Sequence, residues 1–353
     1  MARHSPPDKP AEPDEPFPQP PATVTSAPDL RRVNLAPADW NHTWFRRARP
    51  AFTPARVLVF VSDLHAGNRY GLCDPDFSVR RGGQTYRMTP SWGQLELKRD
   101  FDDFVARVNR WNPDTVVNLG DSTDGVNRKA PGKDRVFTCL DEQADMAAQL
   151  LYPLVYPDGP NRIRRRRKYI CVTGSGYHGS LDTDAEYRIA QLLGQPDGFR
   201  GYVANIALTG TKSGREPFRG RGEKGEKLVF PEVLFNCSHG ASQAFIYQMM
   251  LLDRESLHMD AAAAQRMAAL PNYDGIFHGH WHHAFWAEAR HRVLVINPCW
   301  KCFEPYGGTM KLYPKFAVPQ IGGLVVAIAA DGSLYHEFIL YPAIHMSDAL
   351  TRT

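Results

Sequence analysis

The chain has 353 residues, of which 43% are hydrophobic and 23% are charged. This composition is typical of a folded globular protein and excludes a fully disordered, collagen-like or coiled-coil chain. The net charge of +4 is compatible with an anionic substrate but is too small to indicate nucleic-acid binding by itself.

The N-terminal segment is rich in proline. Residues 1–30 hold nine of the 28 prolines, mixed with Asp, Glu, Ser and Thr. Such a segment cannot bury enough apolar surface to offset the entropy of ordering it. We therefore predict a flexible Pro-rich tail over residues 1–50, one folded domain over 51–345 and a short C-terminal tail over 346–353.

We expect neither a targeting signal nor a membrane span. The N-terminus has no apolar segment of a secretory signal, and no stretch approaches 18 consecutive apolar residues. The six cysteines are scattered, so we interpret them as reduced thiols and expect a cytoplasmic location. Cys299 and Cys302 form a C-x-x-C pair, which is weak evidence for zinc without a second pair.

The first half of the domain alternates strand and helix patterns. Short β-branched runs predict strands, and apolar residues at helical spacing predict helices. A polar stretch fills residues 66–90. In chain order we expect a strand (55–62), a helix (91–111), a strand (114–119), a helix (139–155), a strand (169–173) and a helix (183–194).

The second half is richer in strands. We expect strands at 202–208 and 228–237, helices at 242–253 and 257–269, and strands at 274–278, 284–288, 292–296, 321–329 and 333–340. Together the two halves predict a single α/β domain with one mixed sheet or two packed sheets.

Polar residues able to take part in catalysis follow five of these strands. In open α/β sheets ligands bind outside the carboxyl ends of the strands, so we expect these side chains to converge at one edge. In an extended chain residues i and i+2 point to the same side, which would let each D-x-H or H-x-H pair face one point. The residues are Asp63, His65, Asp121, His178, His239, His280 and His282.

This mixture of carboxylates and imidazoles indicates a metal site. It suits Mn²⁺, Fe, Zn²⁺ or Ni²⁺ better than Ca²⁺, which prefers oxygen. Six or more candidate ligands exceed the need of one catalytic metal, which favours two metals with a bridging carboxylate. Each short motif is common alone, so the ordered set carries the prediction. The alternative, ordinary polar groups at strand ends, does not explain why imidazoles and acids gather there.

The ordered set D-x-H, G-D, a Gly-rich segment with His178, H-G and G-H-x-H resembles the calcineurin-like metallophosphoesterase superfamily over residues 55–340. The segments at 119–125 and around His178 look most like bacteriophage-type members, for which the location would be the host cytoplasm. The resemblance implies a two-layer mixed β-sheet core flanked by helices and a binuclear metal centre. It implies these ligands: Asp63, His65 and His282 for the first metal, Asp121 as the bridge, and His239 and His280 for the second.

One motif departs from the family pattern. The family usually has Gly-Asn-His, in which the Asn ligates the second metal and the His acts on the leaving group. Here the segment runs from Gly174 through Ser175 and Tyr177 to His178, with no Asn. Ser175 or a water could supply the missing oxygen, or His178 could itself become a ligand. We keep His178 as the expected catalytic residue.

The reaction that the resemblance implies is phosphoester hydrolysis. Two divalent metals, with Mn²⁺ favoured and Fe, Zn²⁺ or Ni²⁺ as alternatives, would turn a bridging water into the hydroxide nucleophile. His178 would protonate the leaving oxygen or stabilise charge there. We favour a phosphodiesterase or nuclease-like enzyme. The alternatives are a phosphomonoesterase or protein phosphatase, and a catalytically degenerate scaffold that binds nucleic acid or protein.

Substrate contacts are harder to read from the sequence. The basic run at 162–168 precedes a strand, so we expect it at the sheet edge opposite the metals. A second basic stretch, at 212–227, looks like a loop between strands. Residues 68–92 directly follow the D-x-H motif and are better placed to cover the site, with Arg69 and Tyr70 as candidate contacts to a phosphoester or to nucleic acid.

Three more residues stay open between a role at the site and an ordinary structural one. Asp124 could orient a ligand or cap a turn, with the turn slightly favoured. His278 could support the neighbouring G-H-x-H motif or be a structural histidine. Glu186 could also support the site, but an acid on a helix surface is the default interpretation.

Overall fold

The structure is a computed structural model that describes most of the chain between residues 54 and 344. The described residues are 54, 56–126, 134–159, 166–176, 178, 185–208, 219–221, 227–229, 233–240, 248–264, 273–289, 292–303, 318–329 and 334–344. The tails predicted over 1–50 and 346–353 lie outside them, so the division into tails and domain stays a prediction. None of the described helices is long and apolar enough to cross a membrane.

The first of two five-stranded sheets has the order β14-β13-β1-β4-β5. Strands β1, β4 and β5 run parallel to one another. β13 is antiparallel to β1, and β14 is antiparallel to β13. Their bounds are β1 (Arg56–Val61), β4 (Thr115–Asn118), β5 (Lys168–Cys171), β13 (Ile321–Ile328) and β14 (Leu334–Tyr341).

The second sheet has the order β11-β12-β10-β9-β6 and also contains three parallel strands. Its three middle strands β9, β10 and β12 are parallel, and the two edge strands are antiparallel to their neighbours. Their bounds are β6 (Val203–Leu208), β9 (Val233–Ser238), β10 (Gly275–His278), β11 (Phe285–Ala289) and β12 (Arg292–Ile296). Each sheet therefore contributes three parallel strands whose carboxyl ends share an edge.

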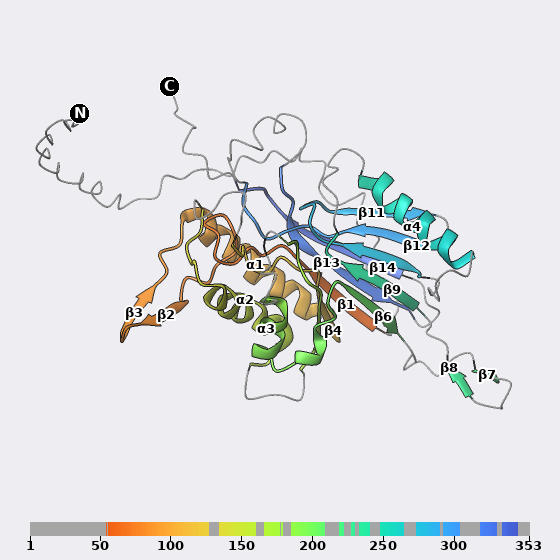
Figure 1. Cartoon of the computed structure of the whole chain (residues 1–353), viewed down its shortest axis with the longest axis horizontal. Coiled ribbons are helices and arrows are strands. Elements are labelled where there is room, and N and C mark those ends of the chain that lie inside the picture. The colour runs from red at the N-terminus through yellow and green to blue at the C-terminus, as the bar shows by residue number, and fades with distance from the viewer. Residues whose placement is uncertain are drawn as a thin grey trace, which may run out of the picture. The chain divides into compact units, whose positions relative to one another are not determined.

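Helices cover the outer faces of the sheets. Figure 1 shows α1, α2 and α3 together on one side and α4 on the other, beside β11 and β12. The helices are α1 (Trp92–Trp111), α2 (Leu140–Val155), α3 (Ala185–Leu192) and α4 (Gln248–Ala264), with a 3₁₀ turn η3 (Pro196–Gly198) after α3. The predicted two-layer mixed sheet flanked by helices is confirmed.

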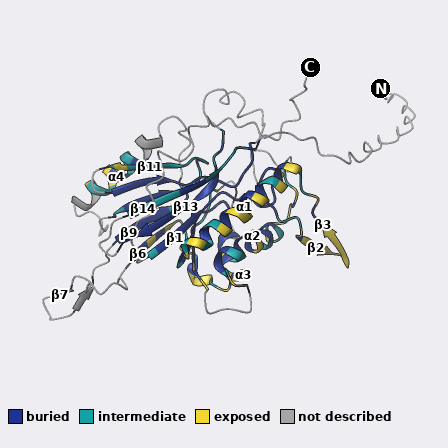
Figure 2. Cartoon of the chain, turned by 180° about the vertical axis from the view of Figure 1, so that it is seen from behind, coloured by how far each residue is buried: buried dark blue, intermediate teal, exposed yellow. Residues whose placement is uncertain are grey.

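Alternation along β1 shows why its sequence belongs between two layers. Val57 and Val59 pack with the helices, whereas Leu58 and Phe60 pack toward the second sheet. Phe60 stacks on Phe277 of β10 with ring centroids 4.5 Å apart. Figure 2 shows the same division as buried strands between helices that are exposed on one face.

α1 follows its predicted span closely because its sequence carries both a cap and an apolar face. Ser91 accepts a hydrogen bond from the Gln94 backbone N–H, and the Gln94 side chain accepts one from the Ser91 N–H. This is the reciprocal capping box that starts a helix. Phe101 and Phe104 then lie fully buried on the inner face.

Some predicted elements differ from the structure. The stretch 66–90 contains a hairpin of β2 (Ser78–Arg81) and β3 (Gln84–Arg87), closed by Gly82 and Gly83. Both glycines have positive φ, 55° and 82°, as a tight hairpin turn needs.

Two further predictions about the second half are corrected. The strand expected at 228–237 is two strands: β8 (Lys227–Val229), which pairs with β7 (Arg219–Arg221), and β9. The helices expected at 242–253 and 257–269 are one continuous helix, α4, because nothing between them breaks the helical backbone.

Candidate metal centre

The carboxyl ends of the parallel strands of both sheets meet at one place. The backbone N–H of Asp63, after β1, donates to the Gly120 carbonyl, after β4, at 2.9 Å. Asp63 Oδ2 accepts the backbone N–H of His280, after β10, at 3.0 Å. His239 Nδ1, after β9, lies 2.7 Å from the Leu119 carbonyl oxygen. The strand ends that the sequence singled out therefore converge as predicted.

The local backbone that achieves this is not the extended chain we expected. Positive φ is rare for residues other than glycine and costs of order 1–3 kcal/mol at each position. Five of the six such residues in the described part of the chain belong to the predicted site. They are Asp63 (55°), His65 (48°), Asp121 (52°), His280 (73°) and His282 (57°). At the ends of β1, β4 and β10 the side chains converge through left-handed backbone positions, not through i, i+2 alternation.

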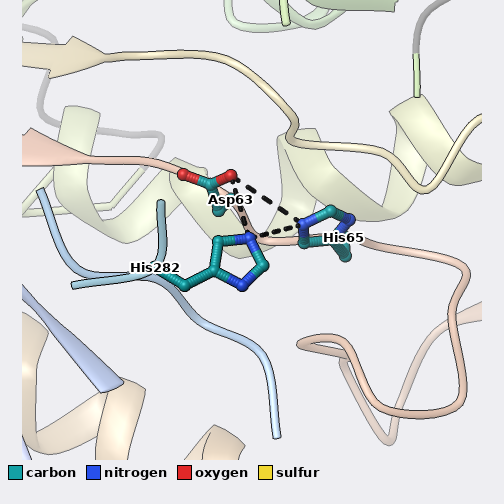
Figure 3. A group of neighbouring side chains, drawn as sticks. All are labelled: Asp63, His65 and His282. Atoms are coloured by element: carbon teal, nitrogen blue, oxygen red, sulfur yellow. Dashed lines mark hydrogen bonds and ion pairs between the residues drawn. The ribbon is translucent and has the colours of Figure 1, made fainter. Parts of the chain in front are cut away.

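Asp63, His65 and His282 form the first group of possible ligands, called here the Asp63 group (Figure 3). His282 Nε2 lies 3.2 Å from Asp63 Oδ1 and 3.3 Å from His65 Nε2. His65 Nε2 is 3.9 Å from the same oxygen, and His239 Nε2 is 4.0 Å from it. Three imidazole nitrogens thus surround one buried carboxylate oxygen.

Asp121, His239 and His280 form the second group, called here the Asp121 group. His239 Nε2 is 2.9 Å from Asp121 Oδ2 and 3.2 Å from His280 Nδ1. Asp121 and His239 are buried, and His280 is partly exposed. The two groups meet at His239, because its Nε2 faces the aspartates of both.

His178 joins His65 and Asp121 in a third overlapping group, with ligand atoms all within 4.8 Å of one another. Its Nδ1 lies 2.8 Å from the Asp124 carbonyl oxygen and 3.5 Å from Asp124 Oδ1. Asp124 Oδ1 is also 3.5 Å from His65 Nδ1. The Asp124 carboxylate thus lies between two imidazoles of the site, which the interpretation as a turn cap did not anticipate.

Two of the imidazoles favour the neutral form. Burial lowers the pKa of His65 to about 3, and the positive charge of Lys301 acts in the same direction. Burial and the neighbouring His239 lower the pKa of His280 to about 4. A neutral imidazole has the lone pair that a metal ligand needs.

Two others favour the protonated form. Burial opposes the charge on His239, but Asp121 and Asp63 outweigh it and raise the pKa to about 9. Burial of His282 is likewise outweighed by Cys299 and Asp63, and its pKa rises to about 10. Each candidate group therefore pairs one carboxylate with one imidazolium when no metal is bound.

The carboxylates stay ionised. Burial alone would raise the pKa of Asp63, but His239 and His282 hold it well below its usual range. Burial of Asp121 is outweighed in the same way by His239 and His178. The cluster thus concentrates buried negative charge that needs positive partners.

The residues fit a divalent cation. Asp63 Oδ1 is buried, and its near polar neighbours in the described residues are imidazole nitrogens, with His282 Nε2 at 3.2 Å. A cation held there would take the place of the imidazolium proton that faces this oxygen. Carboxylate and imidazole donors together are the set that Mn²⁺, Fe and Zn²⁺ accept.

Ser175 stands where the resemblance expected an Asn. Its backbone N–H donates to Asp121 Oδ1 at 2.6 Å, and its hydroxyl donates to Asp121 Oδ2 at 3.1 Å. The neighbouring Gly174 allows this approach, because a Cβ there would lie 2.2 Å from Asp121 Oδ1. Ser175 thus holds the aspartate itself, and Tyr177 lies outside the described residues.

Lys301 is a site neighbour that the sequence reasoning missed. It is buried, and its positive charge contributes to the low pKa values of His65 and Asp124. The same charge partly offsets the rise in the pKa of His178. The signal was available: Lys301 lies a few residues after β12, a sixth parallel strand whose carboxyl end reaches the same edge. The motif at that strand end, the C-x-x-C pair of Cys299 and Cys302, directs attention to its cysteines and not to the lysine between them.

Two of the undecided residues have a clear place. Glu186 is 3% exposed, so the interpretation as a helix-surface acid is wrong. His278 points away from both groups: its Nε2 is 3.2 Å from Glu255 on α4, and its ring stacks on Trp281. Strand alternation places Phe277 between the sheets and therefore His278 on the helix side.

The candidate substrate contacts differ in exposure. Arg69 is exposed, and its guanidinium lies 5.2 Å from the centre of the Tyr70 ring. Tyr70 is buried in the core beneath the helices. In the hairpin that follows, Arg81 pairs with Glu142 of α2. Only Arg69 of the predicted pair is open to solvent, and its contact with substrate stays a prediction.

The basic run is partly described, and that part lies where we predicted. Arg167 precedes β5, so it lies at the edge opposite the carboxyl ends. Its guanidinium is buried and donates to the Leu154 carbonyl at 2.8 Å and to Asn109 Oδ1 at 2.9 Å. This side chain joins the ends of two helices. Residues 162–165 and most of 212–227 lie outside the described residues.

The cysteines do not form a metal group. Five of the six are buried and Cys139 is exposed, with no disulfide among them. The three groups of possible ligands found in the described residues contain no cysteine. Cys299 influences the candidate metal centre through its neighbour His282, because it helps to raise the pKa of that histidine.

No protein-family model matches the sequence, and no curated protein matches it either. Solved structures give weak likenesses over most of the chain. A dimetal phosphatase from Danio rerio is 14% identical, with 82% of this chain and 99% of that chain covered and a TM-score of 0.36. YfcE, a phosphoesterase from E. coli, is 14% identical, with 81% and 98% covered and a TM-score of 0.35.

Vps29 from Entamoeba histolytica, solved with Zn²⁺, is 11% identical, with 80% of this chain and 98% of that chain covered and a TM-score of 0.33. All three TM-scores lie below 0.5. The evidence for function is therefore the site of this chain itself, where two sheets bring carboxylates and imidazoles into two adjoining groups.

Proposed function

We propose that the protein is a binuclear-metal-dependent phosphoester hydrolase of the calcineurin-like metallophosphoesterase type. One observation carries the proposal: imidazole nitrogens of three histidines lie within 4.0 Å of the buried Asp63 Oδ1. The Asp121 group adjoins it through His239. Such a pair of groups suits two divalent cations, with Mn²⁺ as the first choice and Fe, Zn²⁺ or Ni²⁺ as alternatives.

The proposed ligands are the residues of the two groups. Asp63, His65 and His282 would hold one cation, and His239 and His280 the other, with Asp121 between them. When bound, two such cations supply Lewis acidity: they lower the pKa of water and neutralise phosphoryl oxygens. The chain itself contributes orientation, since left-handed turns and backbone hydrogen bonds fix each side chain before substrate arrives.

His178 is the proposed general acid. Burial lowers its pKa, but Asp121 and Asp124 outweigh burial and raise the pKa above its usual value. This shift favours the protonated imidazole, which can give its proton to the leaving oxygen. Its Nδ1 is held by the Asp124 carbonyl at 2.8 Å, which leaves Nε2 as the nitrogen that faces the reaction.

A phosphodiesterase or nuclease-like reaction is our preferred form of this proposal. Arg69 is the first exposed cation after the D-x-H motif, and it suits a second ester arm or a nucleic-acid backbone. A bacteriophage-type origin and a cytoplasmic location belong to the same proposal. A phosphomonoesterase and a non-catalytic binding scaffold are the alternative outcomes of the test.

The test compares substrates on the full chain loaded with Mn²⁺. Hydrolysis of bis(p-nitrophenyl) phosphate, p-nitrophenyl phosphate, single-stranded DNA and double-stranded DNA would be measured side by side. Asp121→Asn should lower turnover by about 10³-fold, whereas Asp145→Asn, which changes a surface acid of α2 paired with Arg188, should not lower it. Turnover of Asp121→Asn that stays near the wild-type rate would refute the proposal. Mn²⁺ binding without turnover of any substrate would favour the scaffold.

A further inference from the structure

Glu186 is a buried acid that neither the predicted motifs nor the metal groups include. It lies in the first turn of α3 and is only 3% exposed. Burying a carboxylate is costly unless donors satisfy it. Its position therefore needs an explanation beyond helix formation.

The donors to Glu186 come from the end of β4. Its Oε1 accepts the Ser122 backbone N–H at 2.8 Å, and its Oε2 accepts the Ser122 hydroxyl at 2.9 Å. Asn118 Nδ2 donates to Oε2 as well, at 3.1 Å. Asn118 in turn accepts the Gly120 N–H through Oδ1 at 3.1 Å. One carboxylate thus fixes both ends of the turn that presents Asp121.

This turn is also the part of the backbone to which other site residues are attached. Carbonyl oxygens of residues 119, 120, 121 and 124 all bond to residues of the candidate site. The pairs are His239 Nδ1 to Leu119 (2.7 Å), Asp63 N to Gly120 (2.9 Å), His65 N to Asp121 (3.0 Å) and His178 Nδ1 to Asp124 (2.8 Å). A shift of this turn would therefore move members of both metal groups together.

We infer that Glu186 is a positioning residue for the metal centre: it acts through Ser122 and Asn118 to hold the 118–124 turn in its left-handed form. This inference rests on the metal binding proposed above. Asp121 has a φ of 52°, so its backbone is strained, and a strained turn persists only when its surroundings hold it. Hydrogen bonds donated to a charged acceptor are strong enough to do so.

The test replaces Glu186 with Gln in the full chain and titrates the protein with Mn²⁺ alone by calorimetry. The amide keeps the shape and one acceptor oxygen, but its NH₂ group faces the donors of Ser122 and Asn118. We expect Mn²⁺ affinity to fall by about 10- to 100-fold, the range for partners that orient ligands. Wild type and Asp121→Asn provide the high and low reference values of Mn²⁺ affinity. The matched control is Glu96→Gln, which changes a surface acid paired with Arg99.

A purely structural role predicts a different result. The melting temperature of metal-free Glu186→Gln would fall while Mn²⁺ affinity, measured where the variant is fully folded, stayed within twofold of wild type; that outcome overturns the inference. Ser122→Ala removes the hydroxyl, which donates to Glu186 and accepts from Asn118 Nδ2 at 2.6 Å. It keeps the backbone N–H bond to Glu186 and should weaken Mn²⁺ binding by less than Glu186→Gln. If wild type binds no Mn²⁺, the metal centre itself is refuted, which is a separate result.

Discussion

The Asp63 and Asp121 groups have the same composition, one aspartate and two histidines, but they hold the aspartate differently. Asp63 Oδ1 faces only imidazole nitrogens among the described contacts. Both oxygens of Asp121 accept hydrogen bonds from Ser175. A cation can reach Asp63 by displacing only an imidazole proton, whereas at Asp121 it also competes with a hydroxyl donor. We therefore expect the Asp63 group to fill first.

The largest effect should come from neutralising the two aspartates separately. Asp121→Asn should leave one tightly bound Mn²⁺ in the Asp63 group, while Asp63→Asn should remove the tight site. Hydrolysis should fall by about 10³-fold in both, because each loses charge next to the reacting phosphate. Equilibrium dialysis gives the stoichiometry. Equal loss of both cations in the two variants would contradict the ordered filling, and Asp145→Asn is the control.

Removing His178 should lower the rate of hydrolysis by less. This variant tests whether His178 is a general acid or a metal ligand of one of the two groups. If it is the general acid, His178→Ala should lower kcat by about 10²-fold for a poor leaving group such as an alkoxide. The loss should be much less for p-nitrophenolate, which leaves without a proton. Mn²⁺ affinity should stay near wild type. A fall in affinity that matches the fall in rate would make His178 a ligand instead.

The parts of this site that could be predicted are those that a short stretch of sequence determines by itself. The strand ends carrying Asp63, Asp121 and His239 were predictable, because a β-branched run followed by acids or imidazoles marks the carboxyl end of a strand. The fold followed from the same runs. The φ values were not predictable, since positive φ at Asp63 and Asp121 depends on contacts between distant turns.

Long-range partners were beyond sequence reasoning for the same reason. Glu186 meets Ser122 across 64 residues, and no spacing rule connects them. An acid in the first turn of a helix is favoured by the helix dipole and usually faces solvent, so its position alone predicted a surface residue. Lys301 was missed because the C-x-x-C motif around it directs attention to Cys299 and Cys302, although the sheet order places this strand end beside the others.

The two groups should respond to pH alike, which is a check on their shared chemistry. Without metal, His239 and His282 are protonated at pH 7, because their pKa values are about 9 and 10. A cation must displace that proton in either group. Affinity for Mn²⁺ should therefore rise by about tenfold per pH unit for each proton released between pH 6 and 8.

Calorimetry in buffers of different ionisation enthalpy measures the protons directly. One proton released per cation is the expected value, since His65 and His280 are already neutral with pKa values of about 3 and 4. Binding that is independent of pH over this range would mean that the carboxylate–imidazolium pairs are not the metal sites.

The smallest and most selective effect should come from Ser175. In Ser175→Ala the backbone N–H still holds Asp121 Oδ1, but Oδ2 loses the hydroxyl donor. A net hydrogen bond is worth about 0.5–1.5 kcal/mol, so affinity for the second cation should rise roughly two- to tenfold. The first cation should be unaffected, because Ser175 does not touch the Asp63 group in any described contact.

Ser175→Thr keeps a hydroxyl at the same position and is the matched control, expected to bind both cations as wild type does. The sign of the Ser175→Ala effect decides what the hydroxyl is. Stronger binding of the second cation means that Ser175 competes for Asp121, as the comparison of the two groups requires. Weaker binding means that its oxygen is a ligand, which would make the Asp121 group as well equipped as the Asp63 group and remove the reason for ordered filling.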